Sequence, residues 1–139
     1  FSHRAARYGF VAKSDYIASS NRDALLIAQV ETVKGLEALP EILQITEVDC
    51  FFFGSADLSQ SLGFPGQTDH PVVRAALDRA LANIREAGRV AGTFVASADE
   101  GVEMVKRGVT YVAIASEQSF LTKGAVAELN RWRGVQTQK

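Results

Sequence analysis

Four short apolar runs, each followed by a stretch of different periodicity, constrain the fold of this chain more than any other feature. Polar and apolar residues do not alternate within the runs, which is typical of parallel strands covered on both faces. The stretches that follow repeat apolar residues at the spacing of an amphipathic helix. The sequence therefore predicts an α/β fold with a parallel sheet. The predicted strands span residues 24–30, 50–53, 90–96 and 110–115.

Proline, glycine and serine mark the boundaries of the predicted helices. Pro40 is expected to divide or restart the first helix, because proline fits a first turn better than a helix interior. Pro71 opens a long amphipathic helix that Gly88 ends, and Ser97 is expected to cap the next helix. The predicted helices span residues 32–43, 56–62, 71–87, 98–107 and, last, 124–132.

The length of the chain bears on whether the sheet is open or part of a closed barrel, which periodicity leaves undecided. An eight-unit barrel runs to about 250 residues, or about 31 per unit. The 139 residues therefore match roughly four units and a lead-in. No linker divides the chain, so we expect residues 1–139 to form a single partial domain. The loop-like opening at Phe1, without an initiator methionine, predicts truncation at the N-terminus.

Charge and cysteine content exclude several classes of partner. The chain has 15 Lys and Arg against 16 Asp and Glu, which predicts no binding to nucleic acid or to an anionic membrane. Its longest apolar runs fall short of the roughly 20 residues that a membrane helix needs. Cys50 is the single cysteine and cannot form an internal disulfide, so we expect it to fill the core of a cytoplasmic protein.

Two carboxylates follow neighbouring predicted strands. Glu31 comes directly after the run that ends at Val30, and Asp57 lies just past the turn that follows Phe53. Ligands bind at the carboxyl edge of parallel sheets, where two carboxylates suit a hard divalent cation. Acids near a helix start are also stabilised by the helix dipole without any function. The spacing alone favours this second explanation.

The turn between the second strand and its helix is a candidate anion site. The segment Gly54-Ser55-Ala56 places backbone N–H groups at a helix start, where they can hold a carboxylate or a phosphate. Glycine and serine are common in such turns for conformational reasons, so this signal is weak by itself. His3 and His70 are the two candidates for a histidine base, and both are interpreted as structural or solvated.

Several of these segments together resemble one known family. They are Ala28-Gln29-Val30-Glu31-Thr32, Phe53-Gly54-Ser55-Ala56-Asp57-Leu58-Ser59, Leu62-Gly63 and His70-Pro71, with the lead-in Arg4–Gly9. In this order they closely resemble the HpcH/HpaI aldolases, which are class II, metal-dependent pyruvate aldolases. The resemblance reverses the preference for a purely structural explanation of Glu31 and Asp57.

The resemblance implies a fold and a set of site residues. It implies the C-terminal half, about four βα units, of a TIM (β/α)8 barrel of the phosphoenolpyruvate/pyruvate-binding type. Glu31 and Asp57 match the family's metal-binding carboxylates, for Mg²⁺ or Mn²⁺, with Co²⁺ as a third candidate ion. The expected substrate-binding residues are Gln29, Gly54, Ser55, Ala56 and, near the aldehyde, Phe94. Ser55 stands where many members have proline, which leaves the neighbouring backbone donors available.

The resemblance also implies an activity. It predicts a lyase that cleaves a 2-keto-3-deoxy acid to pyruvate and an aldehyde through a metal-bound enolate, in a homo-oligomer. In this family a histidine base and an arginine come from the first half of the barrel, and nothing in this chain matches them, so we expect the chain alone to be inactive. The alternatives are an acyl-CoA lyase like the citrate lyase β-subunit, or a non-catalytic half-barrel remnant or assembly module.

Overall fold

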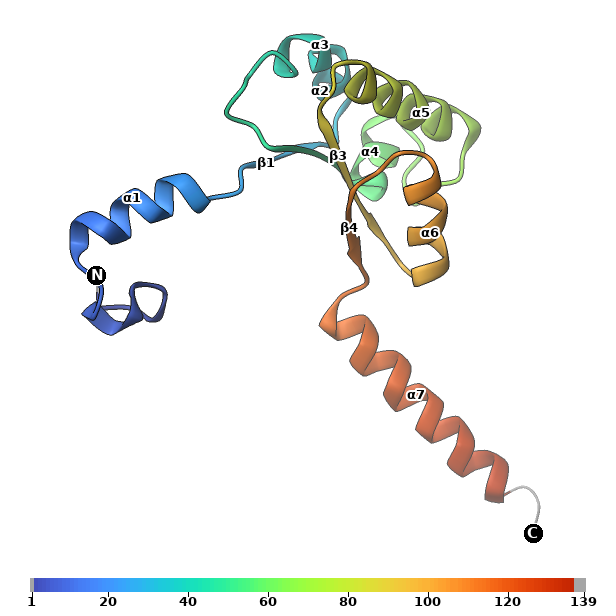
Figure 1. Cartoon of the computed structure of the whole chain (residues 1–139). Helices are drawn as coiled ribbons and strands as arrows, with labels where there is room; N and C mark the ends of the chain where they lie inside the picture. Colours follow the sequence, from blue (N-terminus) through green and yellow to red (C-terminus); the bar gives the residue numbers. More distant parts are fainter. Residues whose placement is uncertain (1, 137–139) are drawn as a thin grey trace.

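A computed structural model, which describes residues 2–136, contains a parallel sheet of four strands in the order β1-β2-β3-β4 (Figure 1). The alternation of strands and helices that the sequence predicts is confirmed. The strands are β1 (Ile27–Val30), β2 (Cys50–Phe53), β3 (Val90–Val95) and β4 (Tyr111–Ile114). The helices are η1 (Arg4–Gly9), α1 (Lys13–Asp23), α2 (Val33–Glu37), α3 (Leu39–Ile42), α4 (Ser55–Ser61), α5 (Pro71–Glu86), α6 (Ala98–Lys106) and α7 (Glu117–Gln136).

The predicted helix boundaries depend on the same residues in the structure. The first predicted helix is divided into α2 and α3 beside Pro40, and Gly88 follows α5 with a positive φ of 68°. The Ser97 hydroxyl accepts a hydrogen bond from the Glu100 N–H at 3.3 Å and so caps α6. On α5, the buried face includes Val73, whereas the neighbouring Val72 is exposed although it is also apolar.

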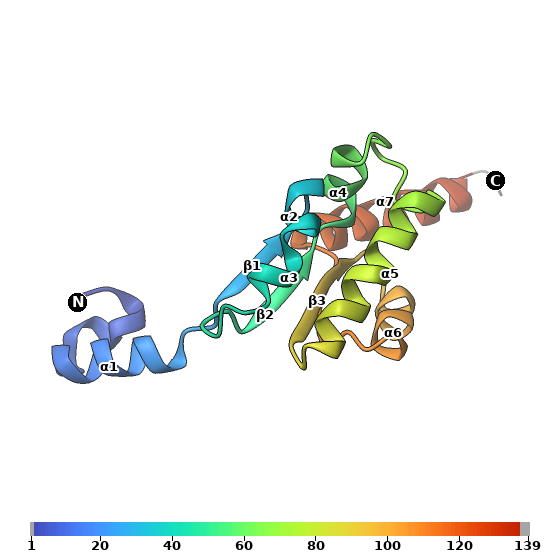
Figure 2. The ribbon, with the colours of Figure 1, turned by 90° about the horizontal axis from the view of Figure 1, so that it is seen from above.

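The core lies between the sheet and the helices on one of its faces. Figures 1 and 2 show α2, α3, α5 and α6 on the same side of the sheet. This arrangement follows from right-handed crossovers between strands that are added in one direction, because each crossover places its helix on the same face. The core side chains are Val30, Leu39, Leu43, Val48, Phe51, Phe53, Ala80, Leu81, Ile84, Ala91 and Val109.

The opposite face of the sheet carries side chains that no helix of the described chain covers. Phe94 is 46% exposed and Tyr111 is 40% exposed, and Gln29 is exposed as well. The expectation that both faces are covered therefore holds for one face only. Its physical reason is the same crossover rule, since no helix of this topology reaches the second face.

Helices α1 and α7 project from the two edges of the sheet (Figures 1 and 2). The sequence did not predict α1, because its residues are mostly polar and lack an apolar stripe. It predicted only residues 124–132 of α7. In the structure α7 starts earlier, because the Ser116 hydroxyl accepts a hydrogen bond from the Ser119 N–H at 3.2 Å and no proline interrupts the helix. None of the helices in residues 2–136 has the length and apolar character needed to cross a membrane.

Arg89 joins the start of β3 to the loop that precedes β2. Its guanidinium donates hydrogen bonds to the carbonyl oxygens of Leu43 at 2.8 Å and Ile45 at 3.0 Å, and a further one to that of Val48. The same group lies 5.2 Å from the centre of the Phe51 ring. Arginine alone presents enough donors in a fixed plane to hold three carbonyls while it stacks on an aromatic ring.

We therefore expect Arg89→Ala to lower the free energy of unfolding by about 2–3 kcal/mol, because it leaves several carbonyls without a charged donor. Arg89→Lys is expected to lose most of the same stability, since an ammonium group cannot bond in this pattern. Urea unfolding followed by circular dichroism measures both changes. Arg79→Ala, on the exposed side of α5, is the matched control. Equal stabilities of the Arg89 and Arg79 variants would contradict this role.

Candidate metal site at the carboxyl edge of the sheet

The register of the sheet places Glu31 and Gly54 side by side. Val30 pairs with Phe53, which pairs with Thr93, so the residues that follow them lie at one level on three neighbouring strands. These residues are Glu31, Gly54 and Phe94. All strands are parallel, so this level is the carboxyl edge, where ligands of such sheets bind.

Glu31 and Asp57 converge over Gly54. A Cβ atom placed on Gly54 would lie 3.0 Å from Oε2 of Glu31 and 3.5 Å from Oδ2 of Asp57. The two carboxylates therefore face one small space, which is open because residue 54 has no side chain. Glu31 is half-buried and Asp57 is exposed, so the site is shielded on the strand side and accessible on the helix side.

Helix capping does not explain Glu31. The N-cap of α2 is Thr32, whose hydroxyl accepts the Gly35 N–H at 3.0 Å, so Glu31 lies outside the helix. Asp57 does lie in the first turn of α4, where the helix dipole favours a negative charge. The position of Glu31 opposite Asp57 thus needs an explanation other than the dipole.

The donor set suits a hard cation. Carboxylate oxygens are the side-chain ligands that Mg²⁺ prefers, usually one or two together with water and substrate oxygens. Within residues 2–136 no group of three or more His, Cys, Asp and Glu side chains is arranged to hold a metal. Glu31 and Asp57 therefore match an ion that keeps most of its positions for water and substrate.

The turn at residues 54–56 places backbone donors beside Glu31 and Asp57, which we call the acid pair. Gly54 is the N-cap of α4, and the first helical hydrogen bond runs from the Leu58 N–H to the Gly54 carbonyl at 2.9 Å. The N–H groups of Ser55, Ala56 and Asp57 precede that bond, so the helix itself provides them with no acceptor. They can donate to an anionic group that approaches the acid pair.

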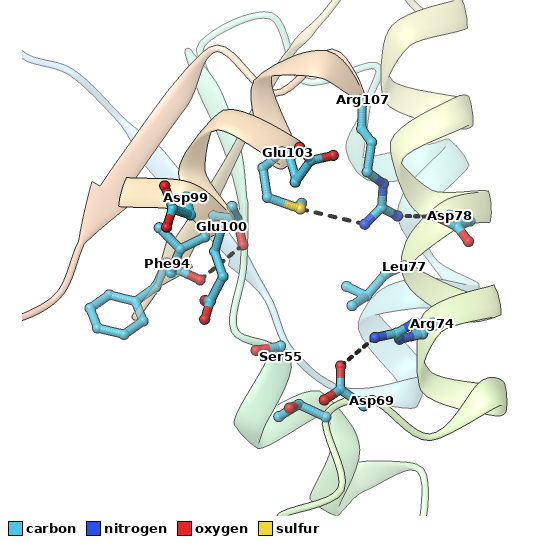
Figure 3. Close-up of a pocket in the computed structure, with 14 residues that line it drawn as sticks. Ser55, Asp69, Arg74, Leu77, Asp78, Phe94, Asp99, Glu100, Glu103 and Arg107 are labelled. Atoms are coloured by element: carbon cyan, nitrogen blue, oxygen red, sulfur yellow. Dashed lines mark hydrogen bonds and ion pairs between the residues drawn. The ribbon is translucent and has the colours of Figure 1, made fainter. Parts of the chain in front are cut away.

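Gln29 and Phe94 lie on the uncovered face of the sheet. Gln29 lies on β1 and alternates with the buried Val30, so its side chain is on the face opposite the core. In Figure 3 the Phe94 ring points away from the groove between α5 and α6. The structure thus brings the side chains of Gln29 and Phe94 to the sheet face that leads up to the acid pair.

A groove of about 690 Å³ opens beside the site, between α5 and α6 (Figure 3). Ser55 and Phe94 are among its lining residues. Its two arginines are paired with lining carboxylates, since Arg74 contacts Asp69 at 2.7 Å and Arg107 contacts Asp78, and its other charged side chains are acidic. The groove therefore adjoins the acid pair without providing an uncompensated positive charge.

The sequence did not predict an aromatic pair on the uncovered face of the sheet, further from the carboxyl edge than Glu31 and Asp57. The rings of Phe52 and Tyr111 meet edge to face, with centres 6.1 Å apart, across Gly92 on the strand between them. A Cβ atom on Gly92 would lie 2.8 Å from Phe52 and 3.1 Å from Tyr111, so glycine is required for this contact. The signal in the sequence was Gly92, since a glycine inside an apolar strand marks a place where other groups approach the backbone closely.

The remaining reactive side chains have structural roles. Cys50 is buried, and burial raises the pKa of its thiol, with a smaller contribution from Asp49. The thiol is therefore neutral, as a core residue should be. Nδ1 of His70 accepts the Val72 N–H at 3.3 Å and so caps α5, while its ring stacks on Phe64 at 3.7 Å between centres. His3 contacts Tyr16 edge to face.

Comparison with known proteins gives consistent matches. The sequence pattern of the HpcH/HpaI aldolase/citrate lyase family matches residues 4–123. The chain is 34% identical over 124 residues to a 4-hydroxy-2-oxo-heptane-1,7-dioate aldolase of Shigella sonnei, covering 89% of this chain and 47% of that protein. It is 36% identical to the aldolase of the same name from Klebsiella pneumoniae, of which it covers 46%.

Solved structures agree with these sequence matches. A crystal structure of an HpcH/HpaI aldolase/citrate lyase family protein from Burkholderia cenocepacia is similar with a TM-score of 0.83 and 32% identity, over 94% of this chain and 50% of that one. An HpcH/HpaI aldolase from Desulfitobacterium hafniense gives a TM-score of 0.78 at 28% identity, over 88% and 48%. The chain thus spans about half the length of the relatives it matches.

The open space over Gly54 leads to a prediction. Gly54→Ala fills this space with a methyl group that displaces the Glu31 carboxylate, so we expect the affinity for Mn²⁺ to fall roughly tenfold. The backbone at residue 54 has φ −97° and ψ 97°, which alanine adopts freely, so the fold is retained. Electron paramagnetic resonance of free Mn²⁺ measures the affinity. Gly124→Ala, where a Cβ meets nothing, is the control, and an unchanged affinity in Gly54→Ala would refute the prediction.

Proposed function

The chain belongs to the HpcH/HpaI aldolase/citrate lyase family, and from this membership we propose that it forms the metal- and pyruvate-binding part of a class II aldolase. The observation that carries the proposal is the convergence of Glu31 and Asp57 over Gly54 at the carboxyl edge. The names of the relatives support an aldolase rather than an acyl-CoA lyase. The proposed substrate is a 2-keto-3-deoxy acid with a hydroxyl group at C4.

Glu31 and Asp57 are the proposed ligands of Mg²⁺ or Mn²⁺, with Co²⁺ as an alternative. When bound, the ion would supply Lewis-acid stabilisation of the negative charge that develops on the keto oxygen during cleavage. Gly54 keeps the space between the ligands free. The N–H groups of Ser55 and Ala56 donate to the carboxylate of pyruvate, and Gln29 lines the same pocket from β1.

The reaction needs proton transfer as well as charge stabilisation. Cleavage breaks the C3–C4 bond, the C4 hydroxyl loses its proton as the aldehyde forms, and C3 gains a proton to complete pyruvate. Neither histidine is placed as the base, because His70 caps α5 and His3 lies against Tyr16. We assign the proton transfer to a residue outside residues 2–136. Phe94, level with Gly54, borders the aldehyde product.

The proposed enzyme works as an assembly. The uncovered sheet face and the edge strands β1 and β4 need partners, since unpaired edges and apolar faces are unstable in water. Helix α7 supports this view, because it exposes large apolar side chains along its length. They are Phe120, Leu121, Val126, Leu129 and Trp132.

Metal titration tests the ligand assignment. We expect the chain to bind Mn²⁺, and Glu31→Gln and Asp57→Asn each to weaken binding by more than roughly tenfold, because each removes a negative ligand. Isothermal titration calorimetry measures the affinities. Glu41→Gln, an exposed acid on α3, is the matched control. Absence of Mn²⁺ binding by the parent chain would instead support a non-catalytic half-barrel module.

A turnover assay tests whether this chain contains the residue that transfers the proton. We expect the chain with Mg²⁺ or Mn²⁺ to release no pyruvate from 4-hydroxy-2-oxo-heptane-1,7-dioate, because no described residue is placed to move the proton. Reduction of pyruvate by lactate dehydrogenase and NADH measures release. A full-length relative such as the Shigella sonnei aldolase is the positive control. Turnover by this chain would show that the base lies within it.

A further inference from the structure

A hydrogen bond connects the segment that carries Glu31 to the helix that carries Asp57. The N–H of Val33 donates to Oγ of Ser61 at 3.0 Å, across 28 positions of the sequence. Val33 is the first residue of α2 and Ser61 is the last residue of α4. The first N–H groups of a helix have no acceptor within it, so the Ser61 hydroxyl acts as a cap from a different helix.

The position of Ser61 on α4 relates it to the acid pair. Asp57 and Ser61 are four residues apart, so they lie on the same face of the helix, one turn from each other. Val33 in turn is two residues after Glu31. One face of α4 therefore carries both the Asp57 carboxylate and the Ser61 hydroxyl. The hydroxyl binds the turn that carries the other carboxylate, that of Glu31.

The backbone of Glu31 needs such a support. The ladder between β1 and β2 ends with the pair Val30 and Phe53, so Glu31 itself lies beyond the last strand pair. On its other side the Thr32 hydroxyl binds Gly35 within α2, which shapes the helix start without connecting it to α4. Among the hydrogen bonds within residues 2–136, the bond from Val33 to Ser61 joins this turn to the helix that carries Asp57.

We propose that Ser61 is a positioning residue that sets the separation of the Glu31 and Asp57 carboxylates through its hydrogen bond to Val33. This inference rests on the proposed function of the two acids as metal ligands. Without the bond, the turn of Glu31 moves relative to α4, and the two carboxylates no longer share one preformed space. The free energy of metal binding must then include the cost of ordering this turn.

The test compares three variants of the full chain. Ser61→Ala removes the hydroxyl, and it does not weaken α4, because alanine favours a helix more than serine does. Ser61→Thr keeps the hydroxyl. Ser59→Ala is the matched control, since the Ser59 hydroxyl donates to Ala56 at 2.7 Å inside the same helix.

Two measurements are made on each variant. In the metal-free chain we expect hydrogen exchange of the Val33 amide to be roughly tenfold faster in Ser61→Ala and unchanged in Ser61→Thr and Ser59→Ala. The affinity for Mn²⁺, from calorimetry, is expected to fall roughly fivefold in Ser61→Ala and to be restored in Ser61→Thr. A general loss of stability would not produce this pattern.

The possible outcomes separate the two proposals. If the parent chain binds Mn²⁺ and Ser61→Ala binds it equally well, the positioning role is wrong while the metal site stands. The role is also wrong if Ser61→Thr binds as weakly as Ser61→Ala, since the hydroxyl would not be the cause. If the parent chain does not bind Mn²⁺, the metal site is wrong and the role of Ser61 falls with it.

Discussion

The parallel pairing of β1 with β2 is the constraint on which the rest of this structure depends. Because Val30 pairs with Phe53, the two strands end at one level, and the next residues, Glu31 and Gly54, become neighbours. A shift of the pairing by one residue would turn every side chain of one strand to the opposite face. The core side chains Phe51 and Phe53 resist that shift, because they would leave the helices for the uncovered face. The packing of the core thus fixes the register that brings Glu31 beside Gly54.

The two faces of the sheet differ in what they contact. The face that packs against the helices contains the core and supplies the stability. The other face presents Gln29, the pair of Phe52 and Tyr111, and Phe94, below and beside the acid pair. In a barrel this face is the interior, which leads up to the site at the carboxyl edge. The relatives are about twice as long as this chain, which matches about half of each of them.

Local signals in the sequence predicted most of the helices and strands. An element that has no such signal was not predicted. Pro71, Gly88 and Ser97 act at helix ends through their own backbone or hydroxyl groups, so their roles can be predicted from neighbouring residues. Helix α1 has no apolar stripe, and it was missed for that reason. Glu31 and Asp57 could be selected because each directly follows a strand or its turn, although their spacing could not distinguish a metal site from a capping role.

The sequence by itself determined the α/β class, the order of its elements, the family resemblance and the identity of the two acids. These depend on short-range periodicity and on contiguous motifs, which a linear chain displays directly. Only the tertiary structure decided that both carboxylates face the space over Gly54, that Ser61 binds Val33, and that Arg89 holds the loop before β2. The pairs Glu31 and Asp57, Val33 and Ser61, and Arg89 and Leu43 each lie more than twenty positions apart, so no linear pattern can show that they meet.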